Sequence, residues 1–278
     1  MIREILSFID DAEAGTAHVR ALLGLAERFD AQLELGVLTA GPMMFPELAP
    51  YTSLYLPEIA LRGDGEAQLG RVRALAGTAP DRAPDRVNVW GFHDSIGWLA
   101  ADVRDSRQIA DLILIGAPET WLHPWLRHRL TENLILSAGT PLLLLPPSGW
   151  SGRVGHAVLG WKPSAHANRV VHDLVALAEP GAHIDIVTIG RAVEPEPDSV
   201  VPGSGIVRHL TRHGFAVELH RLDEGGVEAD QLSAFAIDRK ADLLAVGGFA
   251  HSRIRDIVLG GVTQGLIDKT QLPVLMAH

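Results

Sequence analysis

The sequence predicts an α/β fold made of two tandem, doubly wound, five-stranded parallel-sheet sandwiches. Three observations lead to this prediction: the two halves resemble each other, short continuous apolar runs recur in both, and segments of helical periodicity separate these runs. A continuous apolar run of strand length indicates a strand buried on both faces. Such strands, alternating with helices, are typical of a parallel sheet that is covered by helices on both sides.

The internal repeat is visible in three pairs of segments. A helix-like segment ending in L-x-x-L-A-E occurs once in each half, and two later apolar runs also have counterparts. The pairs are Ile9–Glu27 with Trp161–Glu179, Ala110–Gly116 with Ala241–Gly247, and Pro141–Leu145 with Pro273–Ala277. The spacing between partners shortens after the first pair, which predicts an insertion in the first half at about 42–62. We expect a surface loop there; a lid, a packing arm or a dimer contact are the alternatives.

The two halves are separated by a short segment rich in proline and glycine, Pro146–Gly152, which stops the preceding strand. The predicted domains are therefore residues 1–147 and 153–278. In the first half, Ala17, Leu22, Leu25 and Ala26 form the apolar stripe of a helix, and strands are expected within 110–116 and 140–146. In the second half, the predicted strands cover 157–160, 183–189, 216–222, 242–247 and 273–277.

Composition excludes several classes of function. With 24 Lys and Arg against 34 Asp and Glu, the formal net charge is −10, which disfavours binding to nucleic acids or anionic membranes. The absence of cysteine excludes disulfides, Cys-ligated zinc, iron–sulfur clusters and thiol nucleophiles. Acidic residues interrupt the N-terminal segment before a signal-type apolar region develops, and no apolar run has the roughly 18 residues of a membrane span. We therefore expect a cytoplasmic protein without a nucleic-acid or membrane partner.

Candidate ligand-binding residues follow the fourth apolar run of the second half. In open parallel sheets, ligands bind beyond the carboxyl ends of the strands, and a helix N-terminus attracts phosphate. Four glycines would let backbone N–H groups approach a ligand, and three side chains would add donors for an anion. These residues are Gly247, Gly248, Gly260 and Gly261, and Ser252, Arg253 and Thr263. The alternative is that the glycines make tight turns and the arginines are solvated.

The chain resembles the universal stress protein family in its tandem two-domain form. The resemblance covers nearly the whole chain, and its most specific part is GGFAHSRIRDIVLGGVT at 247–263, followed by LPVLM at 272–276. It implies an α/β sandwich of the adenine nucleotide alpha hydrolase-like type, with the two sheets associated through their final strands as a pseudo-dimer within the chain. A homodimer of whole chains is compatible with this arrangement.

The resemblance also implies an ATP site, with two departures. Nucleotide-binding members of the family show G-x-x-G-x9-G-[ST]; counted from Gly247, its later positions fall on Ala250, Gly260 and Gly261, so one glycine and one hydroxyl are missing. Thr263 could compensate for the hydroxyl. An Asp that contacts adenine in the family is replaced by Lys162, which would meet a phosphate or lie on the surface. The implied site comprises Gly247, Gly248, Ala250, His251, Ser252, Arg253, Gly260, Gly261, Val262, Thr263 and Lys162.

In the first half, the acidic residue of the family is present, but the glycine-rich loop is missing. Asp10 stands at the acidic position of the family, or caps the following helix, but no glycine follows Gly116 until Gly139. Pro118 and Pro124 remove N–H donors from this loop, and Trp121 and Trp125 add bulk that suits packing or a dimer contact. We expect a degenerate site in this half.

Two other kinds of site find only partial support in the sequence. Gly261–Gly265 resembles a nucleophile elbow with Thr263 as nucleophile, but an expected helix or loop at 254–259 precedes it instead of a strand. His209 with His213, and His123 with His128, lack a third metal ligand at a suitable spacing. No metal is therefore predicted.

The expected function is that of a non-catalytic stress-response protein whose second domain binds ATP or another phosphate-bearing nucleotide weakly. Low-level ATP hydrolysis is compatible with this expectation. The alternative is an interaction scaffold in which neither half binds nucleotide.

Overall fold

The computed structural model describes residues 2–39, 65–77, 86–92, 110–137, 139–190, 203–247, 250–253, 256–259 and 261–277. The insertion expected at 42–62 lies outside these residues. The chain divides into two compact units, residues 2–130 and 131–278. The division precedes the segment 146–152 because strand β5, Leu142–Leu144, pairs with a strand of the second unit. The domain limits 1–147 and 153–278 stay a prediction.

The first unit contains a four-stranded parallel sheet in the order β3-β2-β1-β4. Its strands are β1 (Glu4–Ile9), β2 (Gln32–Leu38), β3 (Val87–Phe92) and β4 (Leu112–Ile115). Helices α1 (Thr16–Phe29) and α3 (Gly65–Gly77) contact each other and pack on β2. The short helix η2 (Pro118–Thr120) follows β4, and α5 (Pro124–Ser137) runs across the division between the units.

The second unit contains a six-stranded sheet in the order β5-β12-β9-β6-β7-β8. The strands after β5 are β6 (His156–Gly160), β7 (His183–Ile189), β8 (Ala216–Leu222), β9 (Leu243–Gly247) and β12 (Val274–Ala277). All neighbours are parallel except β5 and β12, which are antiparallel. The central strands are buried almost throughout, as continuous apolar runs require.

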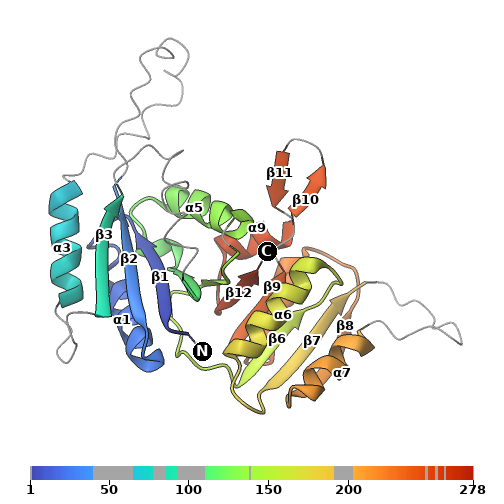
Figure 1. Ribbon diagram of the computed structural model, residues 1–278. Coiled ribbons are helices and arrows are strands. Elements are labelled where there is room, and N and C mark those ends of the chain that lie inside the picture. The colour runs from blue at the N-terminus through green and yellow to red at the C-terminus, as the bar shows by residue number, and fades with distance from the viewer. Residues whose placement is uncertain are drawn as a thin grey trace, which may run out of the picture. The chain divides into compact units, whose positions relative to one another are not determined.

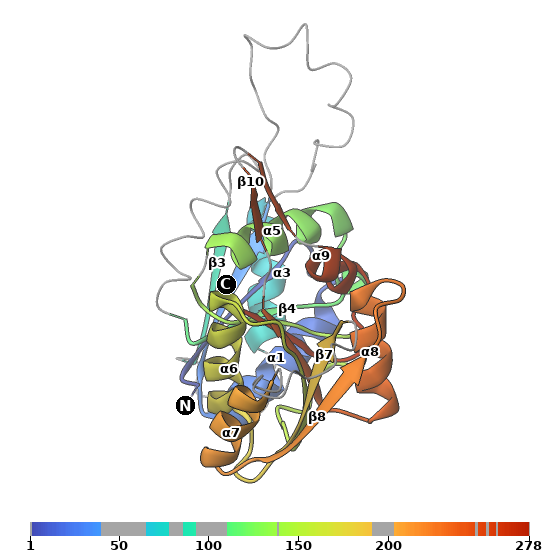
Figure 2. The ribbon, with the colours of Figure 1, turned by 90° about the vertical axis from the view of Figure 1, so that its right-hand side faces the viewer.

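Helices cover both faces of this sheet (Figure 2). Helix α6 (Ala165–Leu177) packs on β9 and β12, and α7 (Ser204–Arg212) packs on β8. On the other face, α8 (Glu228–Asp238) contacts β6, β9 and α9 (Gly261–Asp268). Ser164 begins α6, because its hydroxyl accepts a hydrogen bond from the N–H of Ala167 at 3.0 Å. The doubly wound α/β fold predicted from the sequence is confirmed.

One local prediction is wrong. The sequence predicts a helix or loop at 254–259, but β10 (Ala250–Arg253) and β11 (Asp256–Leu259) form an antiparallel hairpin. The hairpin projects from the unit beside α9 (Figure 1). Within the described part of the chain, no helix is long and apolar enough to cross a membrane.

Candidate functional site

A pocket lies at the carboxyl ends of the strands of the second unit, where the chain changes direction across the sheet. From β6 the chain continues to β7 and β8 on one side, then returns to β9 and β12 on the other. The pocket measures about 400 Å³ with its open mouth included. Its lining residues are Gly160, Trp161, Lys162, Val187, Ile189, Glu228, Leu232, Val246 and Val262. This is the place where open α/β sheets bind ligands.

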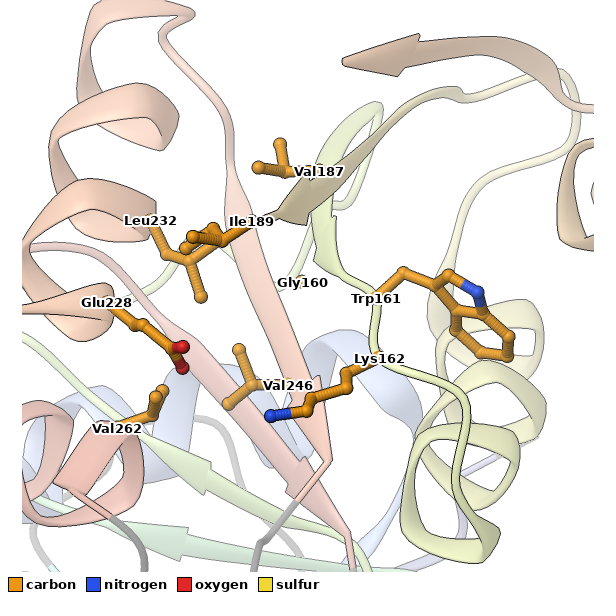
Figure 3. A pocket seen from close by; sticks show the side chains of 9 residues that line it. All are labelled: Gly160, Trp161, Lys162, Val187, Ile189, Glu228, Leu232, Val246 and Val262. Carbon is orange, nitrogen blue, oxygen red and sulfur yellow. The ribbon is translucent and has the colours of Figure 1, made fainter. Parts of the chain in front are cut away.

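The pocket has apolar walls and two charged residues at its rim. In Figure 3, Lys162 points its ammonium group into the pocket near Val246, whereas the Trp161 ring points away from the other lining residues. Lys162 follows the end of β6 by two residues, so the strand fixes its position. Glu228 is the first residue of α8, and its carboxylate faces Val262 (Figure 3). The pocket can therefore accommodate an apolar ring and an adjoining negative charge.

Helix α9 begins at this pocket as well. Its first residue, Gly261, is exposed and has open space around the position of a Cβ atom, and the next residue, Val262, lines the pocket. The N–H groups in the first turn of a helix have no partner within the helix, and they favour an anion. The start of α9 thus adds backbone donors beside the pocket.

Gly247 has a packing role at the end of β9. A Cβ atom there would lie 2.8 Å from the backbone nitrogen of Ala167 and 2.9 Å from the carbonyl carbon of His166. Only glycine allows the start of α6 to approach β9 this closely. Gly247 is not among the described residues that line the pocket.

The other predicted site residues are distributed differently. Ala250, His251, Ser252 and Arg253 form β10, and the placement of their side chains lies outside what the structure describes. Gly248 and Gly260 lie outside the described residues. Thr263 is fully buried and its hydroxyl has no hydrogen-bond partner among the described residues. The structure therefore brings Lys162 and Val262 together at the pocket, with Gly261 beside it.

Sequence reasoning missed most of the apolar wall. Val187, Ile189, Leu232 and Val246 come from two strands and a helix, and each has the ordinary appearance of a core residue. Their common signal is position: the strand residues lie at or near the carboxyl ends of β7 and β9. Glu228 could have been found as a carboxylate at a helix N-terminus.

In the first unit, the corresponding position is filled by the chain itself. The buried carboxylate of Asp10 accepts hydrogen bonds from the backbone N–H groups of Leu122, at 3.0 Å, and His123, at 2.8 Å. Trp121 is also buried, which agrees with a packing role. Asp10 does not cap α1; instead, Asp11 accepts from the N–H groups of Glu13 and Ala14 in the turn before the helix. The hydrogen bonds from the loop after β4 thus use the carboxylate oxygens of Asp10 that a ligand would need.

Buried polar side chains form hydrogen bonds near the end of β4, where this loop begins. Arg127 is fully buried and donates from Nε to the carbonyl oxygen of Gly116 at 2.6 Å. The Ser7 hydroxyl donates to the carbonyl oxygen of Leu114 at 2.6 Å and lies 2.9 Å from Nε2 of His18. Burial, with the charge of Arg127, lowers the pKa of His18 to about 4. A neutral His18 can therefore donate from Nε2 to Ser7.

Comparison with known proteins agrees with this architecture. The sequence model of the universal stress protein family matches residues 155–278. Through this segment, which is less than half of the chain, the protein is similar to the universal stress protein family. A universal stress protein of Synechocystis sp. (strain ATCC 27184 / PCC 6803 / Kazusa) is 29% identical over 147 residues, which are 52% of this chain and 49% of that protein. The chain thus spans about half the length of that curated relative.

Solved structures resemble the fold of this chain over nearly its whole length. A universal stress protein from Archaeoglobus fulgidus DSM 4304 matches with a TM-score of 0.60 and 11% identity, covering 98% of this chain and 95% of that one. A protein of unknown function from Pseudomonas aeruginosa PAO1 matches with a TM-score of 0.53 and 15% identity, covering 99% and 92%. At such identities the likeness concerns the fold.

Proposed function

We propose that this chain is a tandem universal stress protein whose C-terminal pocket binds an adenine nucleotide or a closely similar phosphate-bearing ligand without turning it over. The observation that carries the proposal is the pocket at the switch point of the sheet, with apolar walls, an inward-pointing Lys162 and the start of α9 at its edge. The expected stress-response role rests on the similarity of residues 155–278 to the universal stress protein family.

The pocket suits the two chemical parts of such a ligand. The aliphatic walls from Val187, Ile189 and Leu232 provide a surface on which a planar ring can be buried. Lys162 and the first N–H groups of α9 would contact the phosphates. Because a lysine cannot accept a proton from the adenine amino group, recognition of the base would rest on shape and would be weaker than in members that carry an aspartate there.

The absence of ATP turnover in this proposal is argued from the side chains that line the pocket. Among the described residues that line the pocket, the ionisable ones are Lys162 and Glu228, and none is a serine or threonine. Thr263, the nucleophile of the elbow hypothesis, is buried away from this lining. Since the described lining offers no serine or threonine hydroxyl as a nucleophile, we infer that bound ATP stays intact.

Isothermal titration of the full-length chain with ATP, adenosine and inorganic phosphate tests the proposal. We expect saturable ATP binding that is weakened about tenfold by Lys162→Ala, since one charge-assisted contact is lost. Adenosine binding should change little in this variant. Lys269→Ala is the matched control, because Lys269 is an exposed lysine beyond the end of α9. Val262→Trp should fill the pocket and abolish binding of both ATP and adenosine.

The rival function is a nucleotide-independent interaction scaffold, which the self-occupied site around Asp10 favours for the first half. It predicts no saturable ATP binding at millimolar ligand and no adenine absorbance in the extract of the purified protein. Absence of saturable binding, obtained with folded protein, would overturn the nucleotide proposal.

A further inference from the structure

Three histidines and one aspartate meet on the α8 face of the second unit, at the opposite end of the sheet from the pocket. His156 is the first residue of β6, and it lies beside His183, the first residue of β7. Asp185 is two residues further along β7, so it points to the same face as His183. Asp185 pairs with Glu218 of β8, and His220 follows Glu218 by two residues. Parallel register thus gathers residues that are far apart in the sequence.

The three imidazoles converge on one carboxylate. Nε2 of His156 lies 2.9 Å from Oδ2 of Asp185, and Nε2 of His183 lies 3.0 Å from Oδ1. Nε2 of His220 approaches Oδ1 from the β8 side at 2.8 Å. The Asp185 side chain is fully buried, whereas the three histidine side chains are 23–35% exposed. Solvent, and any ion in it, can therefore reach the imidazoles but not the far side of the carboxylate.

Arg239, which follows α8, adds two more donors to the same carboxylate. Its Nε lies 3.1 Å from Oδ2, and its Nη2 lies 3.2 Å from Oδ1. Five donor contacts exceed the roughly four lone-pair positions of a carboxylate. The group is an ionised, over-coordinated anion.

The hydrogen-bond roles within the cluster conflict at His220. Its Nε2 lies 2.9 Å from Nη2 of Arg239, a nitrogen that can only donate. To accept from Arg239, His220 Nε2 must carry no proton; to donate to Asp185, it must carry one. An imidazole nitrogen that binds a metal ion through its lone pair carries no proton. A cation bound by imidazoles of the cluster would therefore reduce the number of hydrogen-bond donors that face Asp185.

We propose that His156, His183 and Asp185 bind a divalent transition-metal ion of the Zn²⁺ class through two Nε2 atoms and a carboxylate oxygen. The ligand atoms of these three residues lie within 4.8 Å of one another. Zinc bonds of about 2.0–2.2 Å in a tetrahedral site separate ligand atoms by roughly 3.3 Å. The two contacts of Nε2 atoms with Asp185, at 2.9 Å to Oδ2 and 3.0 Å to Oδ1, are close to that separation. Imidazole and carboxylate ligands suit Zn²⁺ and its neighbours rather than Mg²⁺ or Ca²⁺.

His220 and Arg239 hold the carboxylate from its other side and are positioning residues for this site. Glu218 balances the charge of Arg239, to which its carboxylate lies 2.8 Å away. The carboxylate and guanidinium groups of the cluster, those of Asp185, Glu218 and Arg239, therefore sum to one negative charge. The His156 and His183 rings stand edge to face, with centroids 4.9 Å apart, and the Nε2 atom of each ring faces the Asp185 carboxylate.

The test uses the untagged full-length chain, stripped with a chelator and titrated with Zn²⁺ against a chromophoric chelator at neutral pH. Co²⁺ is the spectroscopic probe, because a site with few ligands and low symmetry gives an intense visible band. We expect one equivalent of metal, and at least about a hundredfold weaker binding in His156→Gln and His183→Gln. The glutamine amide keeps an N–H donor toward Asp185 at this position. His220→Gln should weaken binding about tenfold to a hundredfold without shifting the stoichiometry.

The chain offers a matched control in the histidine pair at the end of α7. His209 and His213 have ring centroids 4.7 Å apart, so they are a plausible adventitious metal pair on the same unit. His209→Gln/His213→Gln should keep the tight equivalent and the Co²⁺ band. The proposal is overturned if the wild-type chain binds no equivalent at micromolar Zn²⁺, or if the control variant loses the site while His156→Gln/His183→Gln keeps it. Should the latter variant fail to fold, the Co²⁺ band of the control variant decides alone.

Discussion

Oδ2 of Asp10 lies 2.8 Å from the backbone nitrogen of His123 and 3.0 Å from Nδ1 of the same residue. This double contact ties the end of β1 to the loop after β4. In the second unit, the end of β6 instead carries Lys162, which points into an open pocket. Two halves with related sequences thus use the same position of the fold for different purposes: loop closure in one, a pocket in the other.

Replacing Asp10 by alanine should destabilise the first unit. The change leaves the N–H groups of Leu122 and His123 without their acceptor, and each such loss costs about 1–3 kcal/mol. We expect the free energy of unfolding, measured by urea denaturation, to fall by about 3 kcal/mol. Glu13→Ala, a change of an exposed side chain in the same turn, should stay within about 0.5 kcal/mol. Equal effects of the two changes would contradict this account of Asp10.

His18 should make the first unit lose stability as the pH falls from about 6.5 to about 4. Its pKa falls from 6.5 in the unfolded chain to about 4 in the fold because it is buried, with a smaller effect from Arg127. In this window the unfolded state binds the additional proton, so stability rises with pH. The full difference is about 3 kcal/mol, because one pKa unit corresponds to about 1.4 kcal/mol.

The measurement is the free energy of unfolding as a function of pH for the native chain and for His18→Gln. The glutamine keeps a donor for Ser7 but does not titrate. We expect the slope between pH 6.5 and pH 4 to be shallower in the variant. An unchanged slope would show that His18 is not responsible for it.

Gly247 and Gly261 should respond oppositely to alanine. At Gly247 a Cβ atom would meet backbone atoms of His166 and Ala167 within 3 Å, so Gly247→Ala should lower the free energy of unfolding by about 1–3 kcal/mol. At Gly261 a Cβ atom meets nothing within 4 Å and the residue is helical, so Gly261→Ala should be neutral or stabilising by up to about 1 kcal/mol. Thermal unfolding of both variants provides the comparison. A Gly247→Ala protein of unchanged stability would refute the packing role.

Thr263→Val should leave ligand binding unchanged and raise stability by about 1 kcal/mol. The Thr263 hydroxyl is buried and finds no partner in the described part of the chain, so its removal relieves a desolvation cost at nearly constant volume. ATP titration and thermal unfolding of the variant test both parts. If the Thr263→Val variant lost ATP affinity while its fold and stability were retained, Thr263 would belong to the ligand site after all.

The sequence predicted the strands of the second unit closely, because apolar runs bounded by glycine or proline define most of them. The expected strands at 183–189 and 216–222 have these bounds in the structure. The hairpin of β10 and β11 was not predicted. The sequence between its strands, Ile254 and Arg255, lacks the glycine or asparagine that marks a short hairpin turn.

Site residues were predictable only where a motif or a strand end marked them. Lys162 follows β6 and was expected at the ligand position, whereas Leu232 reaches the pocket only because of the order of strands and helices. The cluster around Asp185 was inaccessible to spacing rules: His156 and His220 are 29 and 35 residues away from it in the sequence. Strand register, which the sequence does not display, brings them together.

The antiparallel pairing of β5 with β12 bears on how the protein can be dissected. A recombinant fragment that starts at residue 153 would leave out β5 and strip the backbone of Val274, Leu275 and Met276 of its neighbour on that side. Bare strand borders of this kind recruit other polypeptides. We expect such a fragment to self-associate or precipitate. A fragment that is meant to fold should therefore retain Leu142–Leu144.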